Sequence, residues 1–319
     1  MKDLPICNNP FCRNEIRHIV ILGHTGFIGS RLTAFFRQQF PELRISGRSY
    51  PEFDLTKKDH ASTLSELFDL NTGVIMCAAI KRQIGDSVDI FAQNLSMITN
   101  LCSVINNYPV RRLVYFSSAA VYGEDIHNDS IIEDTVIFPT SYYGVAKYAS
   151  ECLLRMVLSS RIPDALLILR PPLIYGPNDP SGTYGPAGFV KAALHREKIT
   201  LWGDGNEQRE FIFIEDMVKI VCRLFFHPYS GVVNIASGRS YTFKDVLDII
   251  TRIAPNVLHV DSRQRTKQKV DNGFNNMRLK ELMPDLIFTD IEEGIKQTYE
   301  AGYKGYQDIN ETDKRIPPF

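Results

Sequence analysis

The residues of this chain most suited to chemistry are a tyrosine and a lysine that lie four positions apart. Tyr143 and Lys147 fall in a segment with helical periodicity, and this spacing places both side chains on one face of a helix. A neighbouring ammonium favours the phenolate and lowers the pKa of a tyrosine from its usual value of about 10. Tyr143 is therefore a candidate to protonate a carbonyl oxygen or to deprotonate a hydroxyl. Tyr142 is the rival tyrosine, but its spacing turns it away from the lysine.

A serine upstream completes the candidate catalytic group. Ser118 directly follows the apolar segment Arg112–Ser117, where a strand would bring its hydroxyl to the edge of a sheet and to the same substrate oxygen. A Tyr-x-x-x-Lys pair alone is a common chance pattern on helix surfaces. A glycine loop, a strand-end serine and a Tyr-x-x-x-Lys helix in this order instead predict hydride transfer to or from a nicotinamide. The predicted catalytic residues are Ser118, Tyr143 and Lys147.

The N-terminal glycines predict a loop that would hold such a dinucleotide. They directly follow the apolar run His18–Leu22 and precede a helical pattern over 27–39. One glycine permits a tight turn, another lets the backbone approach a pyrophosphate, and the last lets helix and strand pack closely. The helix N-terminus adds free N–H groups. The alternative is a chance turn. The predicted dinucleotide contacts in this loop are Gly23, Thr25, Gly26, Phe27, Ile28 and Gly29.

The end of the second predicted strand bears on which dinucleotide would bind. NAD sites usually have an acid there, which holds the ribose 2′-hydroxyl, whereas this chain has Arg48 and Ser49 after a strand predicted over 43–46. A guanidinium suits a 2′-phosphate, so the sequence favours NADP(H), with NAD(H) as the alternative. The alternative to a 2′-phosphate contact is that the Arg48 side chain is merely solvated. Asp54 and Leu55 are candidates for the adenine side or, equally, for a helix cap.

Alternating strand and helix patterns must position these residues. Short apolar runs suited to buried parallel strands alternate with helical patterns. They predict an α/β fold, a Rossmann doubly wound parallel sheet with a smaller α/β carboxy-terminal substrate lobe. We expect an irregular leader over 1–17, a dinucleotide-binding domain over 18–175 and a substrate-binding lobe over 176–319, with a returning sheet strand near 232–236. The other expected strands lie at 18–23, 43–46, 73–78, 112–117 and 165–170, and the main helices at 27–39, 87–107 and 141–159.

Bulk composition argues against several other functions. The 319 residues include 36 Lys and Arg against 37 Asp and Glu, a net charge of −1, which gives no electrostatic footprint for nucleic acid or for an anionic membrane. No apolar run reaches the ~20 residues that span a bilayer, and the first residues lack a signal-peptide pattern. We therefore expect a cytoplasmic protein. Its six cysteines are expected to be thiols, and no spacing predicts a metal site.

Taken together, these motifs resemble the extended short-chain dehydrogenases/reductases that act on nucleotide sugars, over about residues 18–299. The resemblance implies that Ser118, Tyr143 and Lys147 are the catalytic serine, tyrosine and lysine. It also implies a homodimer built from the helices near 87–107 and 141–160, and an asparagine behind the active site, Asn94. Further cofactor contacts are implied at Ala78, Ala79, Phe116 and Pro171, and sugar contacts at Ser118, Ala119 and Leu173.

Segments in the second half resemble one group of this family, the GDP-fucose synthases. The similar segments are Leu201–Gly205, Arg209–Phe211, Asp216–Met217 and Met283–Thr289. The resemblance implies that Trp202 and Arg209 serve the nucleotide and its diphosphate, and an arginine fork can bond two phosphate oxygens. The alternatives are core packing for Trp202 and a surface ion pair for Arg209. Lys267 and Lys269 are weaker diphosphate candidates.

Departures from the family patterns narrow the expected reaction. Ala120 stands where the GDP-fucose synthases have the cysteine of double epimerisation, and the region around 187–188 has no acid or base. Ala119 and Ala120 replace the Asp-Glu pair of the 4,6-dehydratases, and Leu173 replaces a frequent asparagine. What remains is an NADP-dependent reductase of a nucleotide-linked 4-keto-6-deoxy sugar, with hydride to C4 and Tyr143 as general acid. The alternatives are an NAD-dependent nucleotide-sugar 4-epimerase and a non-catalytic dinucleotide-sensing protein.

Overall fold

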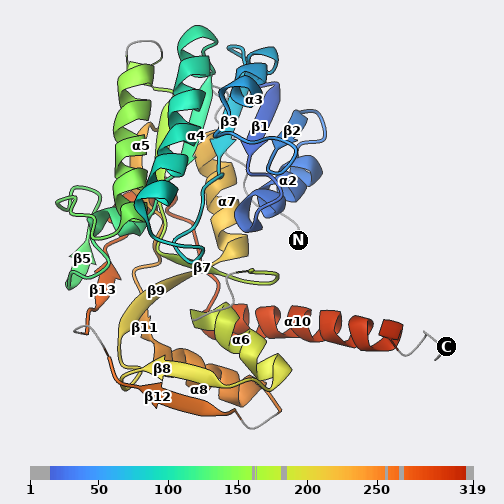
Figure 1. The fold of residues 1–319 in the computed structure, drawn as a ribbon, viewed down its shortest axis with the longest axis vertical. Helices are drawn as coiled ribbons and strands as arrows, with labels where there is room; N and C mark the ends of the chain where they lie inside the picture. Colours follow the sequence, from blue (N-terminus) through green and yellow to red (C-terminus); the bar gives the residue numbers. More distant parts are fainter. Residues whose placement is uncertain are drawn as a thin grey trace.

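The computed structural model describes residues 15–159, 162, 164–180, 185–255, 258–265 and 269–313, with the backbone alone over 305–313. Most of the expected leader over 1–17 therefore lies outside the described residues. Figure 1 shows a larger sheet-and-helix lobe above a smaller lobe, from which the helix α10 (Ile291–Asp313) extends.

A six-stranded parallel sheet forms the centre of the larger lobe. Its order is β10-β6-β4-β3-β1-β2, and every neighbouring pair is parallel. All residues of β1, β3, β4 and β6 are buried, as near-continuous apolar runs predict. The order reverses between β1 and β3, so their carboxyl ends form the switch point where such sheets bind ligands. The strands are β1 (His18–Leu22), β2 (Arg44–Arg48), β3 (Thr72–Met76), β4 (Arg112–Phe116), β6 (Leu166–Arg170) and β10 (Gly231–Asn234).

The second strand ends two residues later than the sequence predicts. Gly47 and Arg48 continue the ladder opposite Ile21 and Leu22 of β1. Glycine is needed here because a Cβ on Gly47 would lie 2.2 Å from Cγ of His24. Arg48 is thus the last residue of the strand and lies beside the loop that follows β1.

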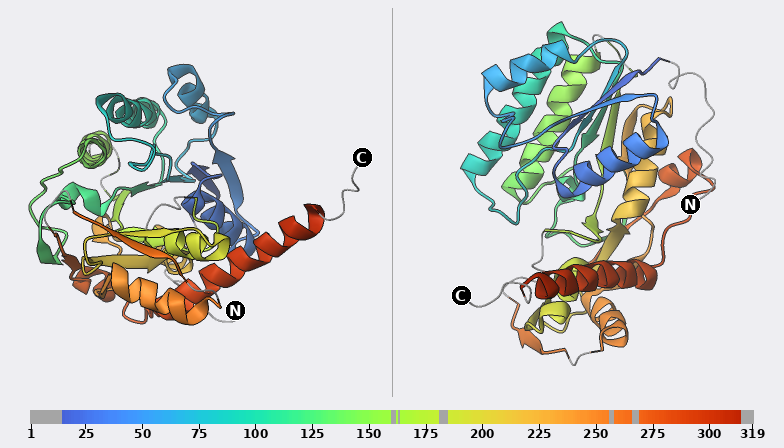
Figure 2. Two further views of the ribbon diagram at one scale, coloured as in Figure 1. Left: turned by 60° about the horizontal axis from the view of Figure 1, so that its bottom comes forward. Right: turned by 90° about the vertical axis from the view of Figure 1, so that its right-hand side faces the viewer.

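Helices cover both faces of the sheet (Figures 1 and 2). On one face α2 (Phe27–Gln39) packs with α7 (Ile214–Phe225) in a buried apolar cluster that includes Phe36 and Phe225. On the other face lie α3 (Lys58–Ser62), α4 (Val88–Asn107) and α5 (Tyr142–Ser159). The doubly wound α/β fold predicted from the sequence is confirmed.

Among the described residues, one helix, α4, is long and apolar enough by length and composition to cross a membrane. This helix packs along α5 and α3 in the larger lobe. Its inner side belongs to the core through the buried residues Asn94, Met97, Ile98, Leu101, Cys102, Val104 and Ile105. Burial inside the fold covers 33% of this apolar span.

The smaller lobe has a core of its own. A buried apolar cluster that includes Phe189, Phe211 and Val246 joins α6, β9, α8 and α10. The sheet of this lobe has the order β11-β9-β7, and two separate strand pairs are β8 with β12 and β5 with β13. The elements are β5 (Asn128–Ile131), β7 (Leu173–Tyr175), α6 (Gly185–His195), β8 (Ile199–Trp202), β9 (Gln208–Phe213), β11 (Ser240–Thr242), α8 (Phe243–Ile253), β12 (Val260–Arg263) and β13 (Asn272–Phe274).

The second half of the chain builds parts of both lobes. The strand expected near 232–236 is β10, which pairs with β6 in the large sheet. Helix α7 packs on α2, and α9 (Met277–Leu282) packs on β10. Leu279 and Met283 lie in the same buried cluster as Phe36. The chain therefore passes between the lobes repeatedly, and the segment 176–319 is not confined to the smaller one.

Candidate active site

The glycine loop after β1 is shaped by close backbone contacts at the sheet switch point. Gly23 has φ +88°, and a Cβ there would lie 2.7 Å from the backbone N of Ala78. A Cβ on Gly29 would lie 2.1 Å from the carbonyl oxygen of Gly23. Helix α2 begins at Phe27, so its free N–H groups face this loop. The glycine cradle has the form that a dinucleotide pyrophosphate requires.

A serine fastens this loop to the end of β2. The Ser49 hydroxyl accepts a hydrogen bond from the backbone N–H of Thr25 at 3.1 Å and bonds Nδ1 of His24 at 2.8 Å. Ser49 is buried, and its hydroxyl is engaged in the loop. The half-buried Arg48, bonded through Nη1 to the Gly47 carbonyl at 2.9 Å, remains as the candidate cation.

Asp54 and Leu55, the candidates for the adenine side of the cofactor, line neither of the two cavities near the catalytic residues. The Asp54 carboxylate accepts hydrogen bonds from the backbone N–H and the hydroxyl of Thr56, at 2.9 and 2.7 Å. Asp54 therefore stabilises the turn before α3. This role is similar to the helix cap that the sequence offered as the alternative. Leu55 is 5 % exposed and packs in the core, so its side chain is not free to face an adenine.

The predicted catalytic residues lie together at the carboxyl end of β4 and the start of α5. Tyr143 is hydrogen-bonded to Ser118, and the Ser118 hydroxyl also accepts from the backbone N–H of Ala120 at 3.1 Å as the N-cap of the short helix η2 (Ala119–Tyr122). Lys147 Nζ donates to the carbonyl oxygen of Phe116 at 2.6 Å and lies 5.6 Å from the ring centroid of Tyr143. We call Ser118, Tyr143 and Lys147 the Ser-Tyr-Lys group.

The protonation of this group differs from the expectation. Burial raises the pKa of Tyr143 to about 12, the hydrogen bond with Ser118 opposes the rise, and the nearby Glu124 carboxylate adds to it. Burial also lowers the pKa of Lys147 to about 8. The direction of the Tyr143 pKa shift is therefore opposite to the expected one, because burial of the phenol is the largest cause. At neutral pH Tyr143 is therefore a protonated phenol, which suits a proton donor.

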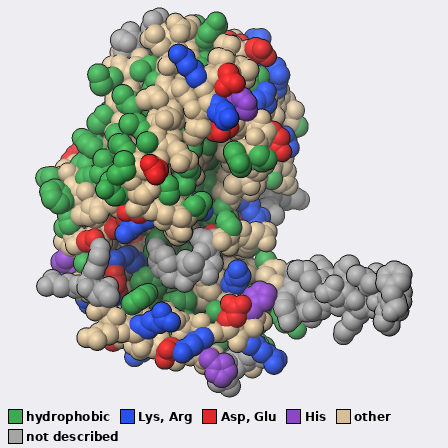
Figure 3. Space-filling model, in the orientation of Figure 1, with side chains coloured by type: hydrophobic (Ala, Val, Ile, Leu, Met, Phe, Trp, Pro, Cys, Tyr) green, Lys and Arg blue, Asp and Glu red, His purple; other side chains and the backbone are tan. Residues whose placement is uncertain are grey.

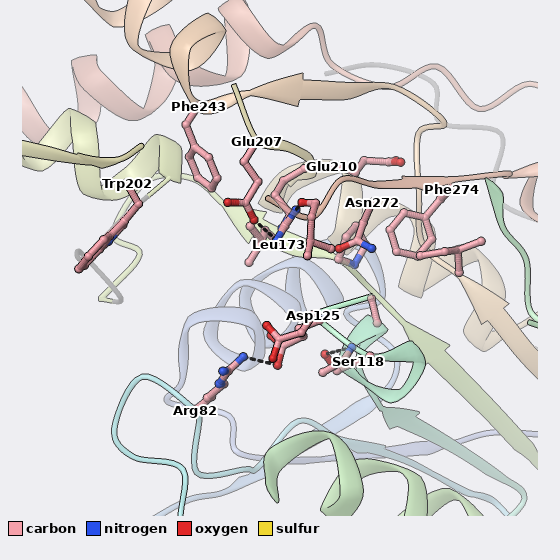
Figure 4. Close-up of a pocket in the computed structure, with 18 of the residues that line it drawn as sticks. Arg82, Ser118, Asp125, Leu173, Trp202, Glu207, Glu210, Phe243, Asn272 and Phe274 are labelled. Atoms are coloured by element: carbon pink, nitrogen blue, oxygen red, sulfur yellow. Dashed lines mark hydrogen bonds and ion pairs between the residues drawn. The ribbon is translucent and has the colours of Figure 1, made fainter. Parts of the chain in front are cut away.

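Two cavities meet at the Ser-Tyr-Lys group. One, of about 600 Å³, is lined by Phe27, Ile28, Ala79, Phe116, Tyr143 and Lys147, among others. The other, of about 520 Å³, is lined by Ala119, Trp202, Arg209 and residues of the smaller lobe (Figure 4). Residues shared by both walls are Arg82, Ser118, Glu124, Pro171, Pro172 and Leu173. We call them the cofactor-side and the substrate-side cavity; most of the glycine loop, Ala78 and Arg48 lie outside both linings.

Buried asparagine and cysteine side chains support this region. Asn94 holds the loop after β3, because its amide accepts from the N–H of Ile80 at 2.8 Å and donates to its carbonyl at 3.0 Å. Cys102 and Cys222 are buried, whereas Cys152 and Cys77 are only partly buried. Cys77 lines the cofactor-side cavity and is thus not simply a core residue.

At the far end of the substrate-side cavity lie the two residues expected to serve the nucleotide. Trp202 is 51 % exposed, so the core-packing alternative is wrong. Arg209 does form an ion pair, with Glu207, but inside the cavity wall rather than on the open surface. Of the two lysine candidates, Lys269 pairs with Asp271 at 2.9 Å, and Lys267 lies outside the described residues.

Three charged features of the cavity were missed in the sequence. Arg82 pairs with Glu124 where the two cavities meet, and the Ser141 hydroxyl donates to Glu124 at 3.1 Å. Glu207 pairs with Arg265 as well as Arg209. Glu124 could have been found from its position in the sequence, because it directly follows Tyr122-Gly123 in the segment that carries Ser118. Nothing local marks Arg265, because its partner is far away in the sequence.

Glu210 is the third such feature. One carboxylate oxygen accepts from the backbone N–H groups of Ser237 and Gly238, the latter at 2.9 Å. The other is buried without a hydrogen-bond partner among the described residues, and burial raises the pKa of Glu210 to about 7. The folded state therefore holds this proton more tightly than the unfolded chain, in which a glutamate titrates near pH 4.3.

This predicts a pH-dependent stability difference between the wild type and Glu210→Gln. The contribution of Glu210 is fully present below about pH 4.3 and is lost as the pH rises towards about 7. Urea unfolding at pH 5 and pH 8 should show the wild type losing on the order of 2 kcal/mol relative to Glu210→Gln over this interval. A constant difference between the two proteins would contradict the raised pKa.

Comparisons with known proteins agree with one another. A model described as the NAD dependent epimerase/dehydratase family matches residues 19–236. The chain is 26% identical over 257 residues to GDP-L-fucose synthase 1 of Arabidopsis thaliana, covering 74% of this chain and 77% of that protein. In structure it is similar to UDP-glucose 4-epimerase of Thermus thermophilus in complex with NAD, with TM-score 0.77, 23% identity and coverage of 90% and 99%. The structure of RMD from Pseudomonas aeruginosa complexed with NADPH gives TM-score 0.76, 19% identity and coverage of 91% and 99%.

Proposed function

The chain belongs to the NAD-dependent epimerase/dehydratase family, and from that premise we propose that it is an NADP-dependent reductase of a nucleotide-linked 4-keto-6-deoxy sugar. The family comprises enzymes of the extended short-chain dehydrogenase/reductase type. The observation that carries the proposal is the position of Tyr143 beside Ser118, the serine that lines both cavities. A phenol at this position can give a proton to a carbonyl oxygen.

The residues of the chain have distinct roles in this proposal. The nicotinamide dinucleotide, when bound, supplies the hydride. The glycine loop binds its pyrophosphate, and the side chains of the cofactor-side cavity exclude water from its reactive end. Ser118 and Tyr143 hold the C4 carbonyl oxygen of the sugar, and Tyr143 protonates that oxygen as C4 is reduced. Lys147, fixed on the Phe116 carbonyl, keeps a positive charge near the phenol and stabilises the phenolate that remains.

The absence of an acid at two positions favours reduction over elimination. Ala119 and Ala120 stand where a dehydratase would need its acid, and Ala119 lines the substrate-side cavity. An NAD-dependent 4-epimerase is the second candidate, because the same Ser-Tyr-Lys group would serve it and a 4-epimerase is among the similar structures. The two candidates differ in whether the cofactor leaves after each turnover.

We expect the cofactor preference to depend on Arg48. Its guanidinium is the cation left at the end of β2 once Ser49 is engaged in the loop, and it suits a 2′-phosphate. Arg48→Ala should weaken NADPH binding roughly 10-fold or more, a loss typical of a charge-assisted hydrogen bond, and leave NADH binding nearly unchanged. Fluorescence titration with both cofactors measures this, with Arg44→Ala on the same strand as the matched control.

The same titration tests the proposed reaction. Exchangeable NADPH, consumed in the presence of a nucleotide-linked 4-keto-6-deoxy sugar, is the expected result. Tightly retained NAD, together with interconversion of C4 epimers and no net consumption of cofactor, would favour the 4-epimerase. A protein that binds no dinucleotide and shows no turnover would contradict both enzyme proposals.

We also propose a homodimer and a cytoplasmic location. Helices α4 and α5 expose Val88, Tyr142, Val145, Tyr148 and Met156, and Figure 3 shows apolar side chains gathered over this side of the larger lobe. A second copy of the chain would cover this face. Sedimentation velocity that finds only monomer at micromolar concentration would contradict the dimer. Cys77, Cys102 and Cys152 are free thiols within the described residues, which supports a reducing compartment.

A further inference from the structure

Glu207 lies between two arginine side chains on the wall of the substrate-side cavity. Its Oε1 pairs with Nη2 of Arg209, and its Oε2 pairs with Nη1 of Arg265. The side chains of all three residues are less than a fifth exposed, at 17–19%. Figure 4 shows Glu207 on the smaller-lobe side of the cavity, opposite Arg82 and Ser118. A carboxylate held through both oxygens by two guanidinium groups has the form of an anion site that is already filled.

Both arginines also contact parts of the chain other than Glu207, and Arg209 is fixed by hydrogen bonds there. Arg209 Nη1 donates to the carbonyl oxygens of Val270 and, at 2.8 Å, of Gln208. Arg265 lies over Gly203, where φ is +69° and a Cβ would come within 2.5 Å of the arginine Nε. Removal of the Glu207 charge would therefore leave the Arg209 guanidinium largely in place, on a wall that Arg265 also lines.

We propose that Glu207 is an internal competitor for the anionic group of the substrate. It occupies the diphosphate site in the empty protein and must leave Arg209 and Arg265 when a nucleoside diphosphate enters. This rests on the proposed function, in which the substrate is a nucleotide sugar. Two arginine forks match the oxygens of a diphosphate, whereas a diphosphate and the Glu207 carboxylate repel each other at such short range.

The consequence of this competition is discrimination by charge. A nucleoside without phosphates cannot replace a carboxylate that bridges two guanidinium groups, whereas a diphosphate carries enough charge to do so. The competition also weakens the binding of every diphosphate ligand, product included, and so favours release. Glu207 lies in the turn between β8 and β9, where Gly203 and Gly205 have φ of +69° and +73°.

The inference is tested with Glu207→Gln and the matched control Glu197→Gln. Glu197 is exposed in the same lobe, so its replacement changes the net charge equally without touching the two arginines. Isothermal titration with UDP and GDP should show about 10-fold tighter binding by Glu207→Gln than by the wild type or the control. Uridine and guanosine should bind all three proteins equally, and in the reductase assay the KM of Glu207→Gln should fall.

A second variant, Glu207→Ala, helps to distinguish failure of this inference from failure of the proposed function. Glu207→Ala should also bind UDP or GDP more tightly than the wild type. Equal or weaker binding by the two variants would mean that Glu207 only holds the arginines in place, and it would overturn the inference alone. If no protein in the series binds UDP or GDP while all bind a nicotinamide dinucleotide, the nucleotide-sugar proposal itself is overturned.

Discussion

Replacing Tyr143 by phenylalanine is expected to reduce kcat by about 10²- to 10⁴-fold, the usual contribution of a positioned general acid. The substitution removes the proton that the C4 oxygen would receive and the hydrogen bond with Ser118. It keeps the ring that Lys147 faces at 5.6 Å, so the dinucleotide affinity should change little. Stopped-flow reduction with NADPH measures the chemical step, and fluorescence titration measures the affinity.

The neighbouring tyrosine provides the control. Tyr142→Phe removes a hydroxyl from a 46 % exposed side chain at the start of the same helix, and its kcat should stay within about twofold of the wild type, as for a surface substitution. If Tyr143→Phe reduced the substrate as fast as Tyr142→Phe, Tyr143 would not be the proton donor. Intact dinucleotide binding together with no turnover in the wild type would favour the sensing protein instead.

Replacing Arg170 by methionine is expected to destabilise the fold by about 3–5 kcal/mol, because it leaves a buried carboxylate with only the half-exposed Arg155, at 3.5 Å, as a charge partner. Glu151 is fully buried, and Arg170 binds it through two bonds, Nε to Oε1 at 2.9 Å and Nη2 to Oε2 at 2.6 Å. The Ser117 hydroxyl donates to the same carboxylate at 2.5 Å. Arg170 Nη1 also donates to the Tyr122 hydroxyl at 2.8 Å. Urea unfolding of the wild type and the variant measures the loss.

A second substitution separates the stability lost with the charge partner of Glu151 from the stability lost with the packing of the Arg170 side chain. The double variant Arg170→Met/Glu151→Leu removes both charges and should recover much of the lost stability, since a buried pair can be replaced by apolar residues at little cost. The exposed pair Arg252–Glu292, with side chains 57% and 52% exposed, supplies the comparison, and Arg252→Met should cost less than about 1 kcal/mol. Equal losses for Arg170→Met and Arg252→Met would contradict the importance of the buried pair.

Features that depend on local pattern could be predicted from the sequence. The apolar runs predicted the buried strands, because a strand covered on both faces needs apolar side chains at every position. The family resemblance is confirmed by the match over residues 19–236. Spacing alone predicted that Tyr143 and Lys147 share a helix face, and the structure brings them next to Ser118. Their catalytic roles stay predictions.

Features that depend on packing between distant segments could not be predicted. Arg265 meets Glu207 only because β8 and β12 pair and bring their ends together. The hydrogen bond between the Ser49 hydroxyl and the backbone N–H of Thr25 is such a tertiary contact. The direction of the Tyr143 pKa shift was wrong for the same reason, since burial follows from the surroundings of a side chain and not from the lysine four residues later.

The repeated passage of the chain between the lobes has a consequence for how such proteins can change. Strand β10 forms one edge of the large sheet, and α7 and α9 complete its core, yet all three follow segments of the smaller lobe in the sequence. The lobe that would select the substrate therefore cannot be exchanged as one continuous segment without removing part of the dinucleotide-binding lobe. Specificity in this architecture is expected to diverge through substitutions and loop changes, residue by residue, rather than through shuffling of whole domains.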